Sequence, residues 1–309
     1  LGAVSGAFLA PVIGWRGLFL VGLVPAALVL MIRYWVPESP RWLMRMGRLD
    51  EARKSLAWAL QVDPTEITLP TRLPEAEKTS WRELFHYPRS MTVACLVALS
   101  QTGGVGILLW ITTLFVMVLK VTPAYAAYLM IYVSLLGIAG RLVASWMSDA
   151  LGRRASGFLI GMGGAVTMAL AGYWHDIYIG GVSVFFVLIM IQRFFGDASY
   201  AIIGPYLAEV WPNRLRASGM GFSYGIGNLG KILGPLGLAL IIGSSNYVSP
   251  KATLGAIFPA LLYLAFWYGQ AGLVFLFAAV ETKGRSIEEI DSALTAPAGS
   301  PAPARAPAV

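Results

Sequence analysis

The feature that most constrains this chain is its series of long apolar runs. A helix needs about 20 mainly apolar residues to cross the hydrocarbon core of a bilayer. Seven windows of the sequence meet this requirement: 17–36, 91–119, 124–146, 156–174, 181–207, 218–243 and 252–279. The runs are continuous and lack the alternation of membrane β-strands. The sequence therefore predicts an all-α polytopic membrane protein. Residues 1–13 are expected to be the last part of one further span.

Composition and charge exclude most other classes of protein. Hydrophobic residues make up 57% of the chain and charged residues only 13%, whereas soluble domains carry about 25% charged residues. The single cysteine, Cys95, excludes a disulfide framework and a cysteine metal site. No cofactor and no metal is expected. The net charge of +7 does not indicate nucleic-acid binding, because the basic residues gather in alternate loops.

The placement of lysine and arginine predicts the orientation. Basic loops are typical of the cytoplasmic side, and the cytoplasmic segments are expected to be 37–90, 147–155, 208–217 and the tail from 280. The shorter loops between them are expected outside: 14–16, 120–123, 175–180 and 244–251. The C-terminus is therefore predicted to be cytoplasmic.

Short polar motifs follow several of these spans. They are Pro37–Leu43 (PESPRWL), Gly140-Arg141, Ser148–Arg154 (SDALGRR), Glu209–Arg216 (EVWPNRLR) and Val280–Gly284 (VETKG). In this order and at these helix ends they resemble the major facilitator superfamily, in particular its sugar-porter-like and organic-solute:proton symporter branch. The resemblance extends over most of the chain.

That resemblance implies a twelve-helix fold of two six-helix bundles, of which this chain lacks the first four helices. The implied parts are 1–36 as the end of the N-terminal bundle, 37–90 as a cytoplasmic central loop with short helices, 91–279 as the C-terminal six-helix bundle and 280–309 as a cytoplasmic tail, disordered from about 292. The implied partners are the missing N-terminal bundle of the same protein, a small-molecule substrate, protons and the lipid bilayer. The implied location is the cell (inner) membrane, as a multi-pass protein.

Acidic and basic residues gather at the predicted cytoplasmic helix ends, where the family forms an inner gate. The predicted gate residues are Glu38, Arg41, Arg141, Asp149, Arg153, Arg154, Glu209 and Arg216. Ion pairs between helices would hold the gate shut and break when it opens. The alternative is a solvated basic loop whose surface pairs contribute little. Ala150, Ser145 and Val280 depart from the family pattern.

Three ionisable residues, Arg193, Asp197 and Lys231, lie deep in the predicted spans, where charge is expensive and indicates function. Arg193 and Asp197 are four residues apart on one helix and either neutralise each other or serve transport. In the second case Asp197 takes up a proton, while Arg193 or Lys231 receives an anionic substrate. The predicted substrate-binding residues are Gln101, Arg193, Lys231, Asn228 and Tyr206.

These observations predict a secondary active transporter for a small organic solute, an organic or aromatic carboxylate, with alternating access and proton symport. Sugar porters usually have a glutamine-rich pattern on the seventh helix, whereas the segment Ser100–Gly104 has one glutamine. Gly204-Pro205-Tyr206 lacks the tryptophan that is common in sugar porters. Both differences argue against a sugar as the substrate. A sugar:proton symporter is the first alternative, and a non-transporting membrane sensor on the same fold is the second. Nothing in the sequence supports an enzyme.

Overall fold

The computed structural model describes residues 2–69, 80–242, 250–284 and 289; of residues 3, 10, 41, 45, 213 and 250–254 it describes the backbone alone. The chain divides into two units. The larger comprises Leu1–Ala7 and Thr79–Val309, and the smaller comprises Phe8–Lys78. Each is described by itself. The tail from 292, predicted to be disordered, lies outside the described residues.

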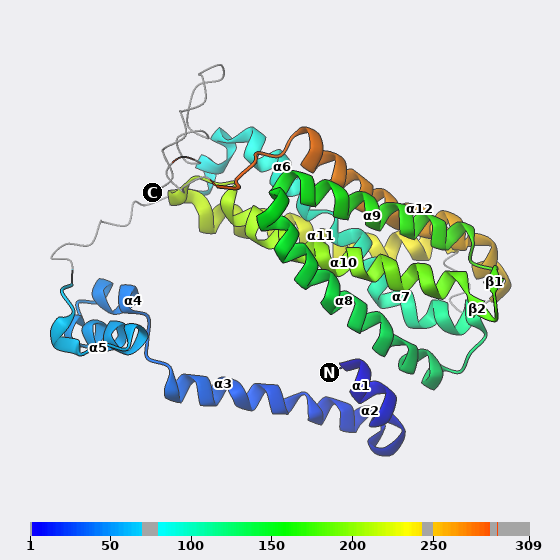
Figure 1. The fold of residues 1–309 in the computed structure, drawn as a ribbon, viewed down its shortest axis with the longest axis horizontal. Coiled ribbons are helices and arrows are strands. Elements are labelled where there is room, and N and C mark those ends of the chain that lie inside the picture. Colours follow the sequence, from blue (N-terminus) through cyan, green and yellow to red (C-terminus); the bar gives the residue numbers. More distant parts are fainter. Residues whose placement is uncertain (1, 70–79, 243–249, 285–288, 290–309) are drawn as a thin grey trace. The chain divides into compact units, whose positions relative to one another are not determined.

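The larger unit is a bundle of long helices (Figure 1). Its helices are α6 (Pro88–Ala98), α7 (Gln101–Leu119), α8 (Pro123–Leu151), α9 (Arg153–Tyr173), α10 (Val184–Glu209), α11 (Arg216–Ile242) and α12 (Pro250–Phe277). A small antiparallel hairpin, β1 (Tyr178–Ile179) with β2 (Val182–Ser183), joins α9 to α10. Two short 3₁₀ turns, η2 (Trp81–His86) and η3 (Asn213–Leu215), precede α6 and α11.

The prediction of seven spans is confirmed within the described residues. Seven helical segments are long and apolar enough to cross a membrane: Pro11–Trp35, Pro88–Leu119, Pro123–Leu151, Arg153–Tyr173, Val184–Glu209, Arg216–Ile242 and Gly255–Phe277. Six of them belong to the larger unit. The mainly helical, polytopic fold class predicted from the sequence is therefore correct.

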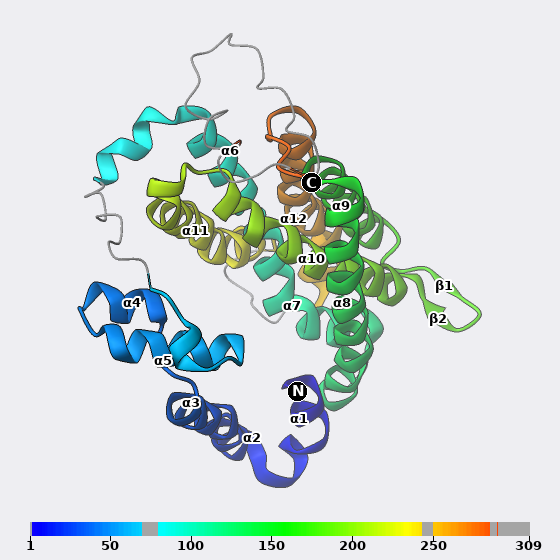
Figure 2. The same ribbon diagram turned by 60° about the vertical axis from the view of Figure 1, so that its left-hand side comes forward.

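Helices that lie far apart in the sequence pack in pairs, α8 against α10, α9 against α12 and α7 against α11 (Figure 2). Small residues allow these close approaches, as in other membrane bundles. A Cβ atom on Gly161 of α9 would lie 2.7 Å from the Cα of Gly272 in α12. A Cβ on Gly234 of α11 would overlap the carbonyl oxygen of Thr102 in α7. These two glycines therefore permit the close approach of α9 to α12 and of α11 to α7.

The smaller unit is a run of short helices: α2 (Ala10–Val21), α3 (Leu23–Trp35), α4 (Pro40–Arg45), α5 (Leu49–Leu60) and the 3₁₀ turn η1 (Pro64–Glu66), preceded by α1 (Gly2–Phe8), most of which belongs to the larger unit. The helical path breaks at Gly14, whose φ of 66° is a backbone conformation that glycine adopts without strain. This break falls where the sequence predicts a loop.

Both short helices predicted in the loop 37–90 are present, as α5 and as η2. Ser80 and Glu83 form a capping box that starts η2. The spacing of apolar residues predicts one apolar face of α5 with Leu49, Ala52, Leu56 and Leu60. Ala52 is fully buried and Leu56 is half-buried, but the prediction is wrong for Leu49 and Leu60, which are exposed. The small residues face α4, which packs closely against them.

Candidate functional site

The predicted pair of Arg193 and Asp197 lies in the middle of α10. Nη2 of Arg193 donates a hydrogen bond of 2.7 Å to Oδ2 of Asp197, and both side chains are about one-tenth exposed or less, at 8% and 10%. A second arginine joins them from α8, because Nη2 of Arg141 donates to Oδ1 of Asp197 at 3.3 Å. The carboxylate therefore stands between two guanidinium groups.

Arg141, which the sequence predicts as a gate residue, lies at this cluster. Side chains of a helix lean toward its N-terminus, so Arg141 covers the turn that begins at Gly137. A Cβ on Gly137 would overlap Oδ2 of Asp197, so this glycine makes the space that the carboxylate occupies. The Arg141 guanidinium also lies 6.0 Å from the centre of the Tyr200 ring.

Further polar groups lie beside the pair. The side-chain amide of Gln192 and the hydroxyl of Tyr268 are buried and lack a well-aligned hydrogen-bond partner within the described residues. A Cβ on Gly196 would lie 2.8 Å from Oη of Tyr268 and 3.2 Å from Nε2 of Gln192. The Gln192 amide and the Tyr268 hydroxyl are neighbours, so each meets part of the other's need for a polar partner.

The other predicted substrate residues divide into two groups. Gln101 of α7 is buried against α11, with its Nε2 atom unpaired within the described residues and 2.6 Å from where a Cβ of Gly227 would lie. Asn228 and Lys231 of α11 are exposed, and Lys231 makes no ion pair with any described residue.

Tyr206 is not brought to this cluster. Its side chain is fully buried, its ring packs on Phe275 at 5.0 Å, and its hydroxyl accepts a hydrogen bond of 3.1 Å from the backbone N–H of Val280. It therefore packs the end of α10 against the end of α12.

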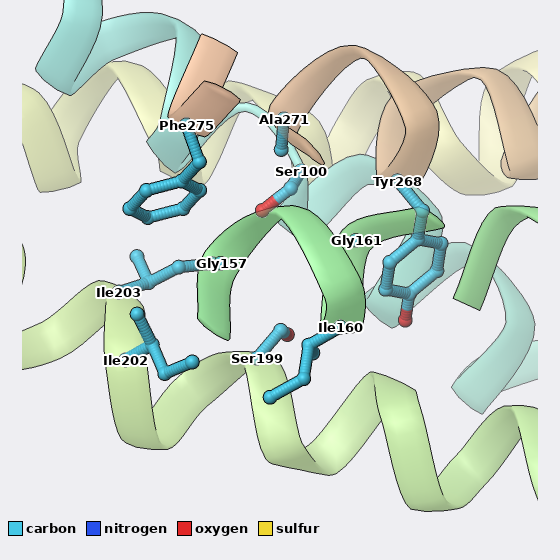
Figure 3. Close-up of a pocket in the computed structure, with 10 residues that line it drawn as sticks. All are labelled: Ser100, Gly157, Ile160, Gly161, Ser199, Ile202, Ile203, Tyr268, Ala271 and Phe275. Atoms are coloured by element: carbon cyan, nitrogen blue, oxygen red, sulfur yellow. The ribbon is translucent and has the colours of Figure 1, made fainter. Parts of the chain in front are cut away.

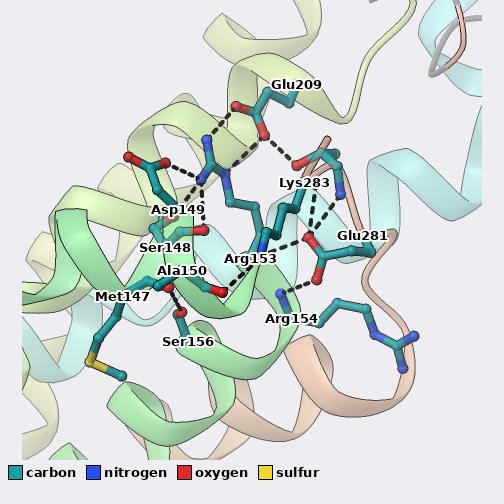
Figure 4. A network of polar contacts seen from close by, with 11 residues as sticks. Met147, Ser148, Asp149, Ala150, Arg153, Arg154, Ser156, Glu209, Glu281 and Lys283 are labelled. Atoms are coloured by element: carbon teal, nitrogen blue, oxygen red, sulfur yellow. Dashed lines mark hydrogen bonds and ion pairs between the residues drawn. The ribbon is translucent and has the colours of Figure 1, made fainter. Parts of the chain in front are cut away.

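Arg153 is the centre of a network at the ends of α8, α9 and α10 (Figure 4). Its Nε and Nη2 atoms form a two-pronged contact with the carboxylate of Glu209, at 3.3 and 3.1 Å. Its Nη1 atom donates to Oδ1 of Asp149 at 3.1 Å and to Oγ of Ser148 at 2.7 Å. Two-pronged contacts of this kind are the stronger and better oriented ion pairs.

Glu281, which follows α12, extends this network. Its carboxylate accepts the backbone N–H groups of Arg153 at 2.9 Å and Arg154 at 3.1 Å, the unpaired donors at the start of α9. Partial burial disfavours the charge of Glu281, but the backbone donors of Lys283, Arg153, Arg154 and Thr282 outweigh it and lower the pKa of Glu281. Thr282 donates from Oγ1 to Glu209 at 2.5 Å. Four helix ends therefore meet at this network.

The remaining predicted gate residues make other contacts. The Arg154 guanidinium donates to the carbonyl oxygen of Leu276 at 2.5 Å. Nε of Arg216 is buried without a hydrogen-bond partner within the described residues. In the smaller unit, Glu38 accepts the backbone N–H of Ser39 at 3.1 Å, while the side chain of Arg41 lies outside the described residues.

A small hollow lies between α9, α10 and α12 (Figure 3). Most of its lining is apolar, and its two hydroxyls, Ser100 and Ser199, already donate to carbonyl oxygens of their own chain neighbours, Val97 and Gly196. It offers no unsatisfied polar group except the hydroxyl of Tyr268. We therefore regard it as a packing hollow and not as the substrate site.

The family model described as sugar (and other) transporter matches residues 1–294. The chain belongs to this family. The computed structure also resembles the crystal structure of a double-tryptophan mutant of XylE, with a TM-score of 0.66 over 95% of this chain and 63% of that one. At 22% identity this likeness shows the fold alone.

Relatives of this transporter-family chain carry different substrates in their names. A probable plastidic glucose transporter 1 of Arabidopsis thaliana is 29% identical, over 91% of this chain and 54% of its own length. The niacin transporter NiaP of Acinetobacter baylyi is 27% identical over 76% of this chain and 53% of its own. The cis,cis-muconate transport protein of the same organism is 23% identical over 81% and 56%. The chain thus spans about half the length of these relatives, and the family is one of membrane transporters, not enzymes.

Sequence reasoning missed two residues of the interior cluster of this family member. Gln192 directly precedes Arg193, and a glutamine beside an intramembrane arginine is a usable signal. Tyr268 lies in a uniformly apolar window, and no local pattern distinguishes it from a packing tyrosine. Tertiary packing alone brings it to Gly196.

Proposed function

We propose that the protein carrying this chain is a secondary transporter that moves a small organic carboxylate by alternating access, coupled to protons. One observation carries the proposal. Among the described residues more than two turns from the ends of the larger unit's spans, three are cations, Arg141, Arg193 and Lys231, and one is an anion, Asp197. Three positive charges and one negative leave a net charge of +2.

An excess of positive charge inside a bilayer is expensive. An anionic solute relieves it, whereas a neutral sugar does not. Lys231 is exposed and without an ion pair in the described part of the chain, so it is the proposed anchor for the solute carboxylate. Asn228 lies one turn before it, and Gln101 supplies an unpaired amide from α7. Both side-chain amides can form hydrogen bonds with polar atoms of the solute other than its carboxylate.

Asp197 is the proposed proton-coupling residue. Its two oxygens each accept a bond from one arginine, at 2.7 and 3.3 Å. A proton on this carboxyl group removes its charge and weakens both ion pairs. Proton binding and the availability of a cation for substrate therefore depend on the same side chain, which is what symport requires.

The network around Arg153 is the proposed cytoplasmic gate element. Its contacts join the ends of α8, α9, α10 and the segment after α12, all within the larger unit. It therefore braces one bundle so that the bundle moves as a body. Asp149, 79% exposed, is the carboxylate of the network best placed to contact another segment when the gate closes.

A sugar:proton symporter is the second candidate. It is favoured by the family description and by the relatives named as plastidic glucose transporters, one of which is 29% identical. The carboxylate proposal draws on the names of two other relatives, since niacin and cis,cis-muconate are both carboxylates. The excess of positive charge in the interior supports the carboxylate.

The test is uptake by the protein reconstituted in liposomes, with labelled sugars and with aromatic and aliphatic carboxylates, with and without an inward proton gradient. We expect gradient-stimulated accumulation of a carboxylate. Uptake of a neutral sugar alone would overturn the proposal in favour of the second candidate. Binding without uptake would indicate a sensor.

Lys231→Ala is the first variant, with Lys231→Arg as its matched control. We expect Lys231→Ala to lose carboxylate uptake by about tenfold or more, because a hydrogen bond to a charged group contributes about 1.5–3 kcal/mol. The arginine variant keeps the charge and most of the uptake. Equal uptake by the alanine variant and the unmodified protein would remove Lys231 from the site.

A further inference from the structure

Arg141 is an unexplained charge in the interior cluster. Together with Arg193 and Asp197 it forms a triad with two positive charges and one negative, so the triad carries a net charge of +1. We infer that the Arg141 guanidinium is a second cation that, with Lys231, receives the carboxylate of the substrate, and that the substrate and Asp197 compete for Arg141. This inference rests on the proposed function and adds a specificity-determining residue to that site.

The two arginines differ in their access to a solute. The Arg193 side chain is 8% exposed and is held by Asp197 at 2.7 Å, so Arg193 neutralises its own helix neighbour. The Arg141 side chain is 59% exposed and holds Asp197 by one longer contact of 3.3 Å. A solute can reach Arg141 without unfolding any part of the bundle.

The position of Arg141 suits a binding site deeper than the gate network. It lies ten residues before the end of α8, or about 15 Å along the helix axis. Its side chain leans toward the N-terminus of α8 and reaches further in, to Asp197 in the middle of α10. The Tyr200 ring beside it offers a flat, mostly apolar wall, 6.0 Å from the guanidinium to the ring centre. A carboxylate on a planar or apolar body fits these two neighbours.

Charge balance predicts which carboxylate pairs with Arg141 in the presence and in the absence of the solute. In the structure Asp197 neutralises part of the charge of Arg141, and the net charge of the triad is +1. A bound solute carboxylate lowers the net charge of the triad to zero. It replaces Asp197 as the partner of Arg141, and Asp197 then pairs with Arg193 only. Loss of the solute returns Arg141 to Asp197. A neutral solute causes neither change, so Arg141 selects for anions.

The experiment measures the KM for carboxylate counterflow exchange, without a proton gradient, in liposomes that contain the natural protein or its variants. Arg141→Gln removes the charge and is expected to raise the KM about tenfold or more. Arg141→Lys keeps the charge but lacks the planar guanidinium group that can bind a carboxylate through two nitrogens, so an intermediate KM is expected. Asp197→Asn removes the competitor and is expected to lower the KM. The double variant is expected to match Arg141→Gln.

The outcomes separate this inference from the proposed function. If the natural protein accumulates a carboxylate but Arg141→Gln has an unchanged KM, the inference is overturned and the proposed function stands. If only neutral sugars are moved, both are overturned. Where Arg141→Gln does not fold, as judged by size-exclusion profile and thermal unfolding, Asp197→Asn decides, because an unchanged or raised KM in that variant contradicts the competition.

Discussion

Individual side chains in this protein derive their roles from their neighbours. Asp197 is held by one arginine of its own helix and one of another. Glu281 is held by backbone N–H groups at the start of α9. In both cases a carboxylate sits where positive charge or unpaired donors would otherwise remain uncompensated. The two acids differ in environment, since Asp197 lies within a span and Glu281 beyond the end of one.

The lowered pKa of Glu281 predicts a pH dependence of stability. A depressed pKa in the folded state means that the ionised group adds stability above its unfolded pKa, near 4.3 for a glutamate, and that this is lost as the pH falls through the folded value. We expect Glu281→Gln to unfold at a lower temperature than the natural protein at pH 7, and the difference to vanish at strongly acidic pH. Thermal unfolding in detergent measures it, with the exposed Glu66→Gln as control. A difference that stays constant with pH would contradict the role of the charge.

Among the helices, the contact of α8 with α10 is the one that builds the interior cluster. It depends on two glycines of α8, since a Cβ on Gly137 would overlap Asp197 and a Cβ on Gly140 would overlap the carbonyl oxygen of Phe194. The close approach brings Arg141 within reach of Asp197. Helix packing, and not sequence proximity, therefore sets which arginines share the carboxylate.

Replacement of one of these glycines tests this contact. We expect Gly137→Ala to destabilise the protein by about 1–3 kcal/mol, because an added methyl group overfills a packed contact, and to impair transport as Asp197 moves. Gly204→Ala on α10 is the matched control, since a Cβ there meets no atom within 4 Å. Thermal unfolding of both variants in detergent compares them, and equal unfolding temperatures would argue against the close approach.

At the scale of the whole molecule, the proposed cycle links a proton site in α10 to a gate network at the helix ends. The distance along α10 from Asp197 to Glu209 is twelve residues, or about 18 Å. A continuous helix with Pro205 in its interior connects the two, and in the proposed cycle a change at one end is transmitted along it as a movement of the bundle. Alternating access needs two bundles that rock about a shared site.

The coupling role of Asp197 is testable only over the complete cycle. Asp197→Asn cannot bind and release a proton, so we expect proton-driven accumulation to be lost while carboxylate exchange continues. Asp176→Asn, at an exposed aspartate between α9 and α10, is the comparison variant and should retain the response to a proton gradient. Accumulation by Asp197→Asn at the natural level would exclude Asp197 as the coupling residue.

The sequence by itself determined the seven spans, the short helices α5 and η2, the family and the pairing of Arg193 with Asp197. Each depends on spacing along one helix or on composition, which the order of residues contains directly. Only the tertiary structure decided that Arg141 belongs to the interior cluster, that Tyr206 packs at the end of α12, and that Tyr268 lies beside Gly196 and Gln192. Those contacts join residues 56 to 76 positions apart, and they follow from how closely the glycine-bearing faces of the helices approach.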